Sequence, residues 1–457
     1  MRKILKTGRL LIACVAFPGL LGAQQVLDNY IQEGFRNNQV LQQKNITLEK
    51  AVLALQIAKS NFLPSVNFSG TYTTAQGGRY SELPVGDMLN PVYATLNQLT
   101  GSGNFPQIEN QQIDFLPKNY YDVYVRTSMP LFNTDVIYNK RIESQKIQLE
   151  EFQVQIYKRE LVRNIKTAYY NYLSASEAVK VYENAIGLVE KNVALNQSLM
   201  ENGKGLNASL MRSQSELENV RAQLNDVMNQ ADNARNYFNF LLNRPMNTPI
   251  EVEQTTDIEV LLKSQGLLGA KDSSRREELD MIRQVEEIQA TVISMNKKYW
   301  VPKVNAFLDL GSQAVDMEFS DKSRYYMVGL NVGIPIFNGF RNNYKIRQSS
   351  LDLKATQLNY QHVDQQLQLS VNVARNNLAT AIRNYAASQE RQKTAESYFN
   401  MIDRGYKEGV NSQIEFIDAN NQLTASSLQV KINEFKILTA LAELERETAG
   451  YELGIGN

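Results

Sequence analysis

The sequence predicts a mixed α/β membrane protein that consists mostly of long coiled-coil α-helices, with four β-strands per chain and two structural repeats. Four segments of roughly ten residues alternate apolar and polar side chains, which is typical of strands with one face in an apolar environment. Two much longer segments place apolar residues at alternating steps of four and three, which is the heptad spacing of coiled coils. Several short motifs also occur twice in the same order, so the second half of the chain is predicted to repeat the first.

The N-terminal segment, residues 1–23, is predicted to be a secretory signal peptide. Residues 1–9 contain four basic side chains, residues 10–21 are apolar, and the small residue Ala23 precedes a polar stretch. We therefore expect the mature chain to begin at residue 24 and to leave the cytoplasm. Cys14 superficially fits a lipoprotein cleavage site, but cleavage there would leave an apolar region of only about four residues, so cleavage after Ala23 is favoured.

The composition excludes several classes of function. The full chain contains 48 basic and 48 acidic residues, and this balance argues against a nucleic-acid partner. Cys14 is the only cysteine and His362 the only histidine, so thiol nucleophiles, histidine-based catalysis and soft-metal sites are nearly excluded. We expect no enzymatic activity, no cofactor and no dedicated metal site. No apolar run of about 18 residues follows the signal peptide, so we expect no membrane-spanning helix.

Each repeat is predicted to contain a helix, a pair of strands, a long helix and a return helix. The first repeat, residues 24–243, is expected to have strands at about 64–74 and 119–131, a long helix over 134–201 and a return helix over 208–243. The second repeat, residues 274–450, is expected to have strands at about 301–313 and 324–336, a long helix over 340–404 and a return helix over 412–449. Residues 244–273 are predicted to form an equatorial or linker segment, and residues 451–457 a C-terminal tail. The first strand pair encloses an insertion over residues 75–118, rich in Gly, Asn, Gln and Pro, which is expected to be a long exposed loop.

Four prolines mark the predicted junctions between helices and strands. Pro64 in NFLP and Pro302 in YWVP precede the first strand of each repeat. Pro130 in MPLFN and Pro335 in IPIFN stand where the second strand gives way to the long helix. Because proline has no N–H to donate to a sheet ladder, each of these positions is expected to end an element.

The number of strands predicts that several chains assemble. Strands of about ten residues are long enough to cross a bilayer when tilted, and open strand edges are not tolerated in lipid. Four strands cannot close by themselves, so we expect either a dimer that supplies eight strands or a trimer that supplies twelve. The polar face of the predicted strands suits a water-filled lumen.

The order of the elements and several landmark motifs resemble the TolC family of outer membrane efflux proteins. The motifs are NFLPSVNFSGTY, MPLFN, NFLLNRPMNTPIEVE and GYKEGVNSQIEFIDANNQL, and the resemblance extends over essentially the whole mature chain. It implies a homotrimer with a 12-stranded outer membrane β-barrel and a coiled-coil α-barrel in the periplasm of a Gram-negative bacterium. It also implies a passive exit duct of a tripartite efflux pump or a type I secretion system. The implied partners are a periplasmic adaptor protein, an inner membrane pump and outer membrane lipid.

The same resemblance implies a gate at the periplasmic tip. Glu415 and Asp418 stand where the family places a pore-constricting acidic pair, and their spacing puts both on one face of a helix. In a trimer these carboxylates would form a ring that could bind cations. Tyr406 matches an aromatic position with which the family tethers the inner coiled coil. A solvated helix face for the acidic pair and heptad packing for Tyr406 are the alternatives. We expect Glu415→Ala combined with Asp418→Ala to raise single-channel conductance and to weaken block by divalent cations.

The turns at the helix tips are candidate contacts for the adaptor protein. They contain Gly205 and Leu206 in the first repeat and Gly409 and Val410 in the second. Gly205 and Gly409 are expected to supply the tight backbone of two equivalent turns, and a plain helix-hairpin turn is the alternative. Asn411 stands where the best-known member of the family has an Arg, so we expect a gate that is held differently.

The competing interpretation is a secreted trimeric coiled-coil structural protein or adhesin without transport. The heptads fit this interpretation. The duplicated arrangement of paired strands and helical hairpins does not. A purely structural relative of the channels is a further alternative. The cargo, whether a drug, a metal ion or a protein, is left open by these residues.

Overall fold

The computed structural model describes residues 25–116, 118–252 and 276–453. The predicted signal peptide with Cys14, residues 253–273 of the predicted linker and residues 454–457 of the tail lie outside the described residues. The chain divides into two units. The first comprises Met1–Ala51, Lys146–Glu287 and Leu353–Asn457, and the second comprises Val52–Gln145 and Ile288–Asp352.

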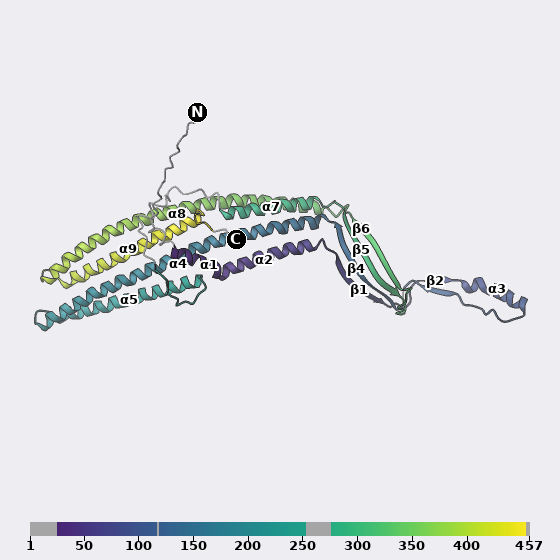
Figure 1. Cartoon of the computed structure of the whole chain (residues 1–457), viewed down its shortest axis with the longest axis horizontal. Helices are drawn as coiled ribbons and strands as arrows, with labels where there is room; N and C mark the ends of the chain where they lie inside the picture. Colours follow the sequence, from purple (N-terminus) through teal and green to yellow (C-terminus); the bar gives the residue numbers. More distant parts are fainter. Residues whose placement is uncertain (1–24, 117, 253–275, 454–457) are drawn as a thin grey trace, which may run out of the picture. The chain divides into compact units, whose positions relative to one another are not determined.

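The described elements follow one pattern twice: helices, strands, a very long helix and a return helix (Figure 1). In the first half these are α1 (Gln25–Asn37), α2 (Gln39–Ser60), β1 (Ser65–Thr73), β2 (Tyr80–Leu83), α3 (Val85–Thr100), β3 (Gln111–Asp114), β4 (Tyr120–Phe132), α4 (Thr134–Glu201) and α5 (Asn207–Leu241). In the second half they are α7 (Glu277–Lys297), β5 (Lys303–Ala314), β6 (Arg324–Gly333), α8 (Arg341–Lys407) and α9 (Gln413–Glu447).

The second unit contains an antiparallel sheet with the strand order β1–β4–β5–β6. Ser65 pairs with Ser128, and Lys303 pairs with Gly333, so the four junctions between strands and long helices lie at one end of this sheet (Figure 1). The outer strands, β1 and β6, each have one edge that no other described strand covers. The sheet of a single chain is therefore open on both sides.

The two faces of this sheet differ in polarity, as the alternating sequence predicts. Phe68, Leu310 and Val328 lie exposed on one face. On the other face, the Arg126 guanidinium donates two hydrogen bonds of 2.7 Å to the Asp309 carboxylate on the neighbouring strand. Paired polar groups on one face and exposed apolar groups on the other are what strands between lipid and water require.

The junction prolines do not all end their strands. Pro64 and Pro302 stand immediately before β1 and β5, and Pro335 follows β6. Pro130, in contrast, lies inside β4, and the register with β5 shifts between Pro130 and Phe132. The expectation that Pro130 ends its strand is therefore wrong, because a bulge accommodates the missing N–H and the strand continues.

The insertion in the first repeat is not a plain loop, which corrects the expectation from its composition. It forms a short hairpin, β2 paired with β3, that encloses the helix α3. Asn90 donates to the Ile108 carbonyl and accepts from its N–H, both at 2.9 Å. Asn97 makes the same pair of bonds with the Phe105 backbone at 2.8 and 3.1 Å. The asparagines that indicated a loop thus bond the backbone N–H and C=O groups of the segment after α3, which has no strand partner there.

The first unit consists of antiparallel helical hairpins packed along heptad seams. Ala185 and Val189 of α4 pack against Leu217 and Val220 of α5. In the second hairpin, buried residues of α8 (Ala374, Leu378 and Ala381) pack against buried residues of α9 (Ile437, Leu441 and Leu444). The predicted coiled-coil packing is therefore confirmed. Within the described ranges, no helix is both long and apolar enough to cross a membrane.

A buried ionic network fixes the start of α7 in the first unit. Arg276 is 1% exposed and donates to the carboxylates of Glu278 (2.7 and 2.9 Å) and Glu447 (2.9 Å). It also donates to the Glu447 carbonyl (2.7 Å), and Arg446 donates to Glu278 (2.9 Å). These bonds join the start of α7 to the end of α9, so the two termini of the second repeat are held together.

Candidate functional site

The turn between α8 and α9 is a tight helix cap centred on Gly409. The Val410 N–H donates to the Gly405 carbonyl (2.7 Å) and the Gly409 N–H donates to the Tyr406 carbonyl (3.1 Å), which together form a Schellman motif. Gly409 has a φ of 74°, in the left-handed region that a glycine adopts without strain. The sequence expectation for Gly409 is thus met by its backbone.

The turn between α4 and α5 uses a different glycine from the one expected. Gly203 has a φ of 71°, and the next N–H, that of Lys204, donates to the Leu199 carbonyl (2.8 Å). Gly205 lies outside the left-handed region and instead approaches α4 closely, because a Cβ there would lie 2.9 Å from the Leu199 Cβ. The expected equivalence of Gly205 with Gly409 is therefore wrong: the equivalent of Gly409 is Gly203.

Glu415 closes a capping box at the start of α9. Its carboxylate accepts from the Ser412 N–H (2.6 Å), and its own N–H donates to the Ser412 hydroxyl (3.3 Å). The Asn411 amide also donates to the carboxylate (3.5 Å). These bonds, the Ser412 backbone N–H above all, lower the pKa of Glu415 below its usual value. The structure therefore gives this exposed carboxylate a local role that the sequence interpretation did not include.

Asp418 lies one turn further along α9 and is exposed. Its carboxylate accepts from the Gln422 amide (2.8 Å), which leaves it on the helix surface. The described residues include no group of three or more His, Cys, Asp and Glu side chains placed to hold a metal ion. Glu415 and Asp418 thus contribute negative charge near the tip without forming a metal site within one chain.

Tyr406 connects the two hairpins. Its hydroxyl donates to the Asn196 Oδ1 on α4 (3.0 Å), and its ring packs against Phe416 of α9 with the ring centroids 5.1 Å apart. Asn196 is 4% exposed and donates in turn to the Asn192 carbonyl (2.9 Å). The sequence interpretation missed the role of Asn196, although it is the only polar residue at the heptad positions that run from Leu161 to Met200, which was a usable signal.

A second neutral hydrogen bond joins the hairpins nearer the tip. The Gln413 amide at the start of α9 donates to the Ser209 carbonyl in the first turn of α5 (2.7 Å). We call the Tyr406–Asn196 and Gln413–Ser209 hydrogen bonds the tip latch. Both bonds are between uncharged groups, so the latch has no ionic component.

Comparison with known proteins identifies the family. A family model described as outer membrane efflux protein matches residues 30–244 and 275–450. This chain belongs to the outer membrane efflux protein family. Its two matched segments are the two halves of the pattern in Figure 1. No curated protein sequence matches the chain.

Solved structures of channels have the same fold as this efflux protein. The CmeC outer membrane channel of Campylobacter jejuni aligns with a TM-score of 0.71 at 14% identity, over 94% of this chain and 87% of that chain. The open state of the MtrE outer membrane channel of Neisseria gonorrhoeae aligns with a TM-score of 0.67 at 17% identity, over 93% and 88%. VceC of Vibrio cholerae aligns with a TM-score of 0.69 at 12% identity, over 93% and 97%.

The family assigns the broad function of this efflux protein. It is an outer membrane efflux channel of tripartite pumps, located in the outer membrane of Gram-negative bacteria and extending into the periplasm. It is a transporter and not an enzyme. Channels of the TolC family form trimers and work with efflux pump partners generally. The alternative of a coiled-coil adhesin without transport is thereby excluded.

The two hairpins of the efflux protein are joined differently along their length. Away from the tip, α4 and α9 are joined by ion pairs, Arg163 with Glu443 (3.2 Å) and Lys166 with Glu445 (2.5 Å). Near the tip, the tip latch is the connection and it is neutral. Among the described residues, the polar contacts between the hairpins are thus ionic near the end of α9 and neutral near the tip, where Leu188 of α4 also packs against the apolar cluster of α8 and α9.

The predicted adaptor contacts of the efflux protein lie on its surface. Leu206 is 72% exposed and Val410 is 82% exposed. Val410 directly follows the left-handed Gly409, and Leu206 lies three residues after the left-handed Gly203, so both stand in the turns that join the helices of a hairpin. Two exposed aliphatic side chains at the hairpin tips are available for contact with another protein.

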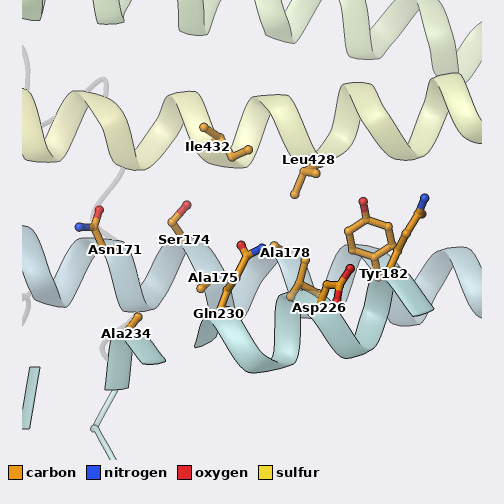
Figure 2. Close-up of a pocket in the computed structure, with 12 residues that line it drawn as sticks. Asn171, Ser174, Ala175, Ala178, Tyr182, Asp226, Gln230, Ala234, Leu428 and Ile432 are labelled. Carbon is orange, nitrogen blue, oxygen red and sulfur yellow. The ribbon is translucent and has the colours of Figure 1, made fainter. Parts of the chain in front are cut away.

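A groove of about 500 Å³ lies between α4, α5 and α9 of the efflux protein (Figure 2). Small side chains of α4, Ser174, Ala175 and Ala178, form its floor, and Leu428 and Ile432 of α9 face them (Figure 2). The lining contains no nucleophile paired with a base, so it offers no catalytic chemistry. Its place between the hairpins shows where they pack less tightly than at the seams.

Proposed function

We propose that three copies of this channel enclose one lumen and that their α8–α9 hairpins gate it at the periplasmic tip. The open edges of β1 and β6 support a homotrimer, because three copies joined edge to edge would supply twelve strands without a free edge. The observation that carries the gate is the Tyr406–Asn196 hydrogen bond, since it joins the hairpin with the acidic pair to the neighbouring hairpin.

The tip latch holds the proposed gate closed weakly. To open it, α8–α9 moves away from α4–α5 and breaks two neutral hydrogen bonds. A neutral hydrogen bond contributes about 1 kcal/mol net, so opening each chain costs about 2 kcal/mol from these bonds. A binding partner supplies that much free energy readily, so opening by the pump assembly fits this latch.

Glu415 and Asp418 are proposed to form an acidic ring below the latch. The capping hydrogen bonds from Ser412 lower the pKa of Glu415, so they favour the ionised carboxylate that the ring requires. Three copies bring these carboxylates towards one axis, where their mutual repulsion favours cation uptake. The ring therefore attracts cations and adds to the constriction.

We propose that the exposed tips contact a periplasmic adaptor protein, which connects the channel to an inner membrane pump. Leu206 and Val410 are the residues assigned to this contact, because both are exposed and apolar at the ends of the hairpins. Cargo is selected by the pump, and the channel conducts passively.

Single-channel recording in planar bilayers tests the gate. Purified trimers should conduct ions, and Glu415→Ala with Asp418→Ala should raise conductance and weaken block by divalent cations. Glu390→Ala with Glu396→Ala, which removes two exposed carboxylates of α8, is the matched control and should leave both unchanged. Absence of conductance in the wild type at any voltage, pH or salt concentration would leave a purely structural channel relative as the better interpretation.

A further inference from the structure

A collar of exposed basic residues surrounds the end of the sheet where the strands meet the long helices. It comprises eight residues of the second unit: Lys59, Lys140, Arg141, Lys297, Lys298, Arg341, Lys345 and Arg347. Each junction contributes at least one of them, before β1, after β4, before β5 or after β6. We call this set the basic collar.

The basic collar is not neutralised by neighbouring acids. The flanking segments, residues 52–64, 133–145, 288–302 and 334–351, contain only two acidic residues, Asp135 and Glu143. Asp135 is already paired with Lys303 at the start of β5. None of the eight collar residues forms an ion pair with another residue in the part of the chain that the structure describes. The collar is thus a strongly positive surface on a chain whose formal net charge is zero.

The opposite end of the same sheet has the opposite charge. Its connections, residues 74–119 and 315–323, contain seven acidic and three basic residues. The net charge is therefore positive only at the end that continues into the periplasmic helices. A sheet that spans the outer membrane places this end at the periplasmic leaflet, which consists of phospholipids.

Exposed apolar side chains accompany the collar. Ile336 is 93% exposed and Phe337 is 73% exposed in the segment between β6 and α8. Trp300, next to Lys297 and Lys298, is 58% exposed, and Tyr344 lies exposed between Arg341 and Lys345. Aromatic side chains at the level of the headgroups, beside basic residues that reach phosphates, are the arrangement by which proteins hold a lipid surface.

We propose that the basic collar binds anionic phospholipid of the periplasmic leaflet through its headgroup phosphates. The lysine and arginine side chains contact the phosphates, while Ile336, Phe337 and Trp300 enter the adjacent acyl region. Each basic side chain near an anionic surface adds to the attraction, so an anionic phospholipid should be about five- to tenfold enriched over a zwitterionic one at the collar.

Trp300 makes the proposal testable at the site itself, because it is the only tryptophan of the chain. The full channel is reconstituted in phosphatidylcholine vesicles that contain the same mole fraction of either brominated phosphatidylglycerol or brominated phosphatidylcholine. Bromine quenches nearby tryptophan fluorescence, so the ratio of quenching reports which lipid occupies the collar. We expect stronger quenching by the anionic lipid, and we expect the ratio to approach one in about 1 M salt, where charges are screened within about 3 Å.

Two quadruple variants with equal loss of charge separate the collar from the general charge of the protein. Lys140→Gln, Arg141→Gln, Lys297→Gln and Lys298→Gln together remove half of the collar and should reduce the quenching ratio at least twofold towards one. The control removes four exposed basic residues at the other end of the sheet: Arg79→Gln, Lys118→Gln, Lys322→Gln and Arg324→Gln. This control should retain the ratio of the wild type.

Two results would overturn the proposal. One is a wild-type ratio of one, and the other is a collar variant that keeps the wild-type ratio while remaining trimeric. Sedimentation with purified peptidoglycan provides the alternative outcome, because loss of sedimentation in a collar variant with unchanged quenching would assign the collar to the cell wall. Conductance of the same preparations is measured separately, so failure of the gate proposal is distinguishable from failure of this one.

Discussion

Tyr406→Phe is the most direct test of the tip latch. The substitution removes one hydroxyl and keeps the ring that packs against Phe416, so the apolar contact is retained. It deletes the 3.0 Å hydrogen bond to Asn196 Oδ1 and leaves that oxygen without its donor. Because Asn196 is 4% exposed, water does not readily replace the hydroxyl while the tip is closed.

The free-energy cost of Tyr406→Phe to the closed state follows from the burial of Asn196. A buried polar atom that loses its partner costs about 1–3 kcal/mol, and opening the tip would return the atom to water, so the cost falls on the closed state alone. With about 1 kcal/mol per chain and three chains that open together, the closed state loses about 3 kcal/mol. At about 1.4 kcal/mol for each factor of ten, the equilibrium shifts towards the open state by about 150-fold.

Open probability in planar bilayers measures this shift. Tyr398→Phe is the matched control, since Tyr398 contributes to the same apolar cluster and its hydroxyl has no partner among the described residues. We expect Tyr406→Phe to open far more often and Tyr398→Phe to behave as the wild type. Trimeric Tyr406→Phe with the open probability of the wild type would refute the latch, as would an equal effect of both substitutions.

Four further predictions concern the tip and the ionic network. Ser412→Ala should cost about 1 kcal/mol of local stability and speed hydrogen exchange in the first turn of α9. Because the pKa of Glu415 is lowered, its capping contribution is present above the unfolded pKa and is lost as the pH falls through the folded pKa; acidification should therefore speed that exchange in the wild type but not in Glu415→Gln. Gly409→Ala should lower the free energy of unfolding by about 1 kcal/mol, because alanine is strained at a positive φ. Gly187→Ala, in open space on α4, should raise the free energy of unfolding by about 0.5–1 kcal/mol. Equal effects in thermal unfolding would contradict the assigned turn. Arg276→Ala should destabilise the channel by about 3 kcal/mol in thermal unfolding, because it leaves the partly buried carboxylates of Glu278 and Glu447 with fewer cations; a loss below about 1 kcal/mol would show that Arg446 suffices.

The sequence predicts those features of this channel that depend on periodicity. Heptads predict long coiled-coil helices, and alternation predicts strands with an apolar and a polar face, because both patterns repeat over many residues and a few exceptions do not obscure them. Local geometry is harder to predict. Gly203 and Gly205 are two residues apart, and which of them takes the left-handed conformation depends on where α4 ends.

The missed features share a cause, which is that a polar side chain has several possible partners. Asn90 and Asn97 indicate a loop by composition. In the structure their side chains form hydrogen bonds with the backbone that follows α3, and these partners lie too far along the chain to be read from local sequence. In the sequence, Asn196 is only a polar exception among apolar heptad residues. Its role becomes apparent when the structure places Tyr406, 210 positions away, beside it. Glu415 matches an acidic position of the family, but its capping bonds become apparent only when Ser412 is known to be the N-cap of α9.

The uncovered edges of β1 and β6 have a consequence for the biogenesis of the channel. A lone subunit would bring unpaired backbone groups into lipid, so membrane insertion and oligomerisation must occur as one coupled event. The concentration of newly made chains therefore sets how much functional channel accumulates. A subunit with a damaged β1 edge would draw intact subunits into oligomers that cannot close. Mutations at this edge are therefore expected to be genetically dominant over the wild-type allele.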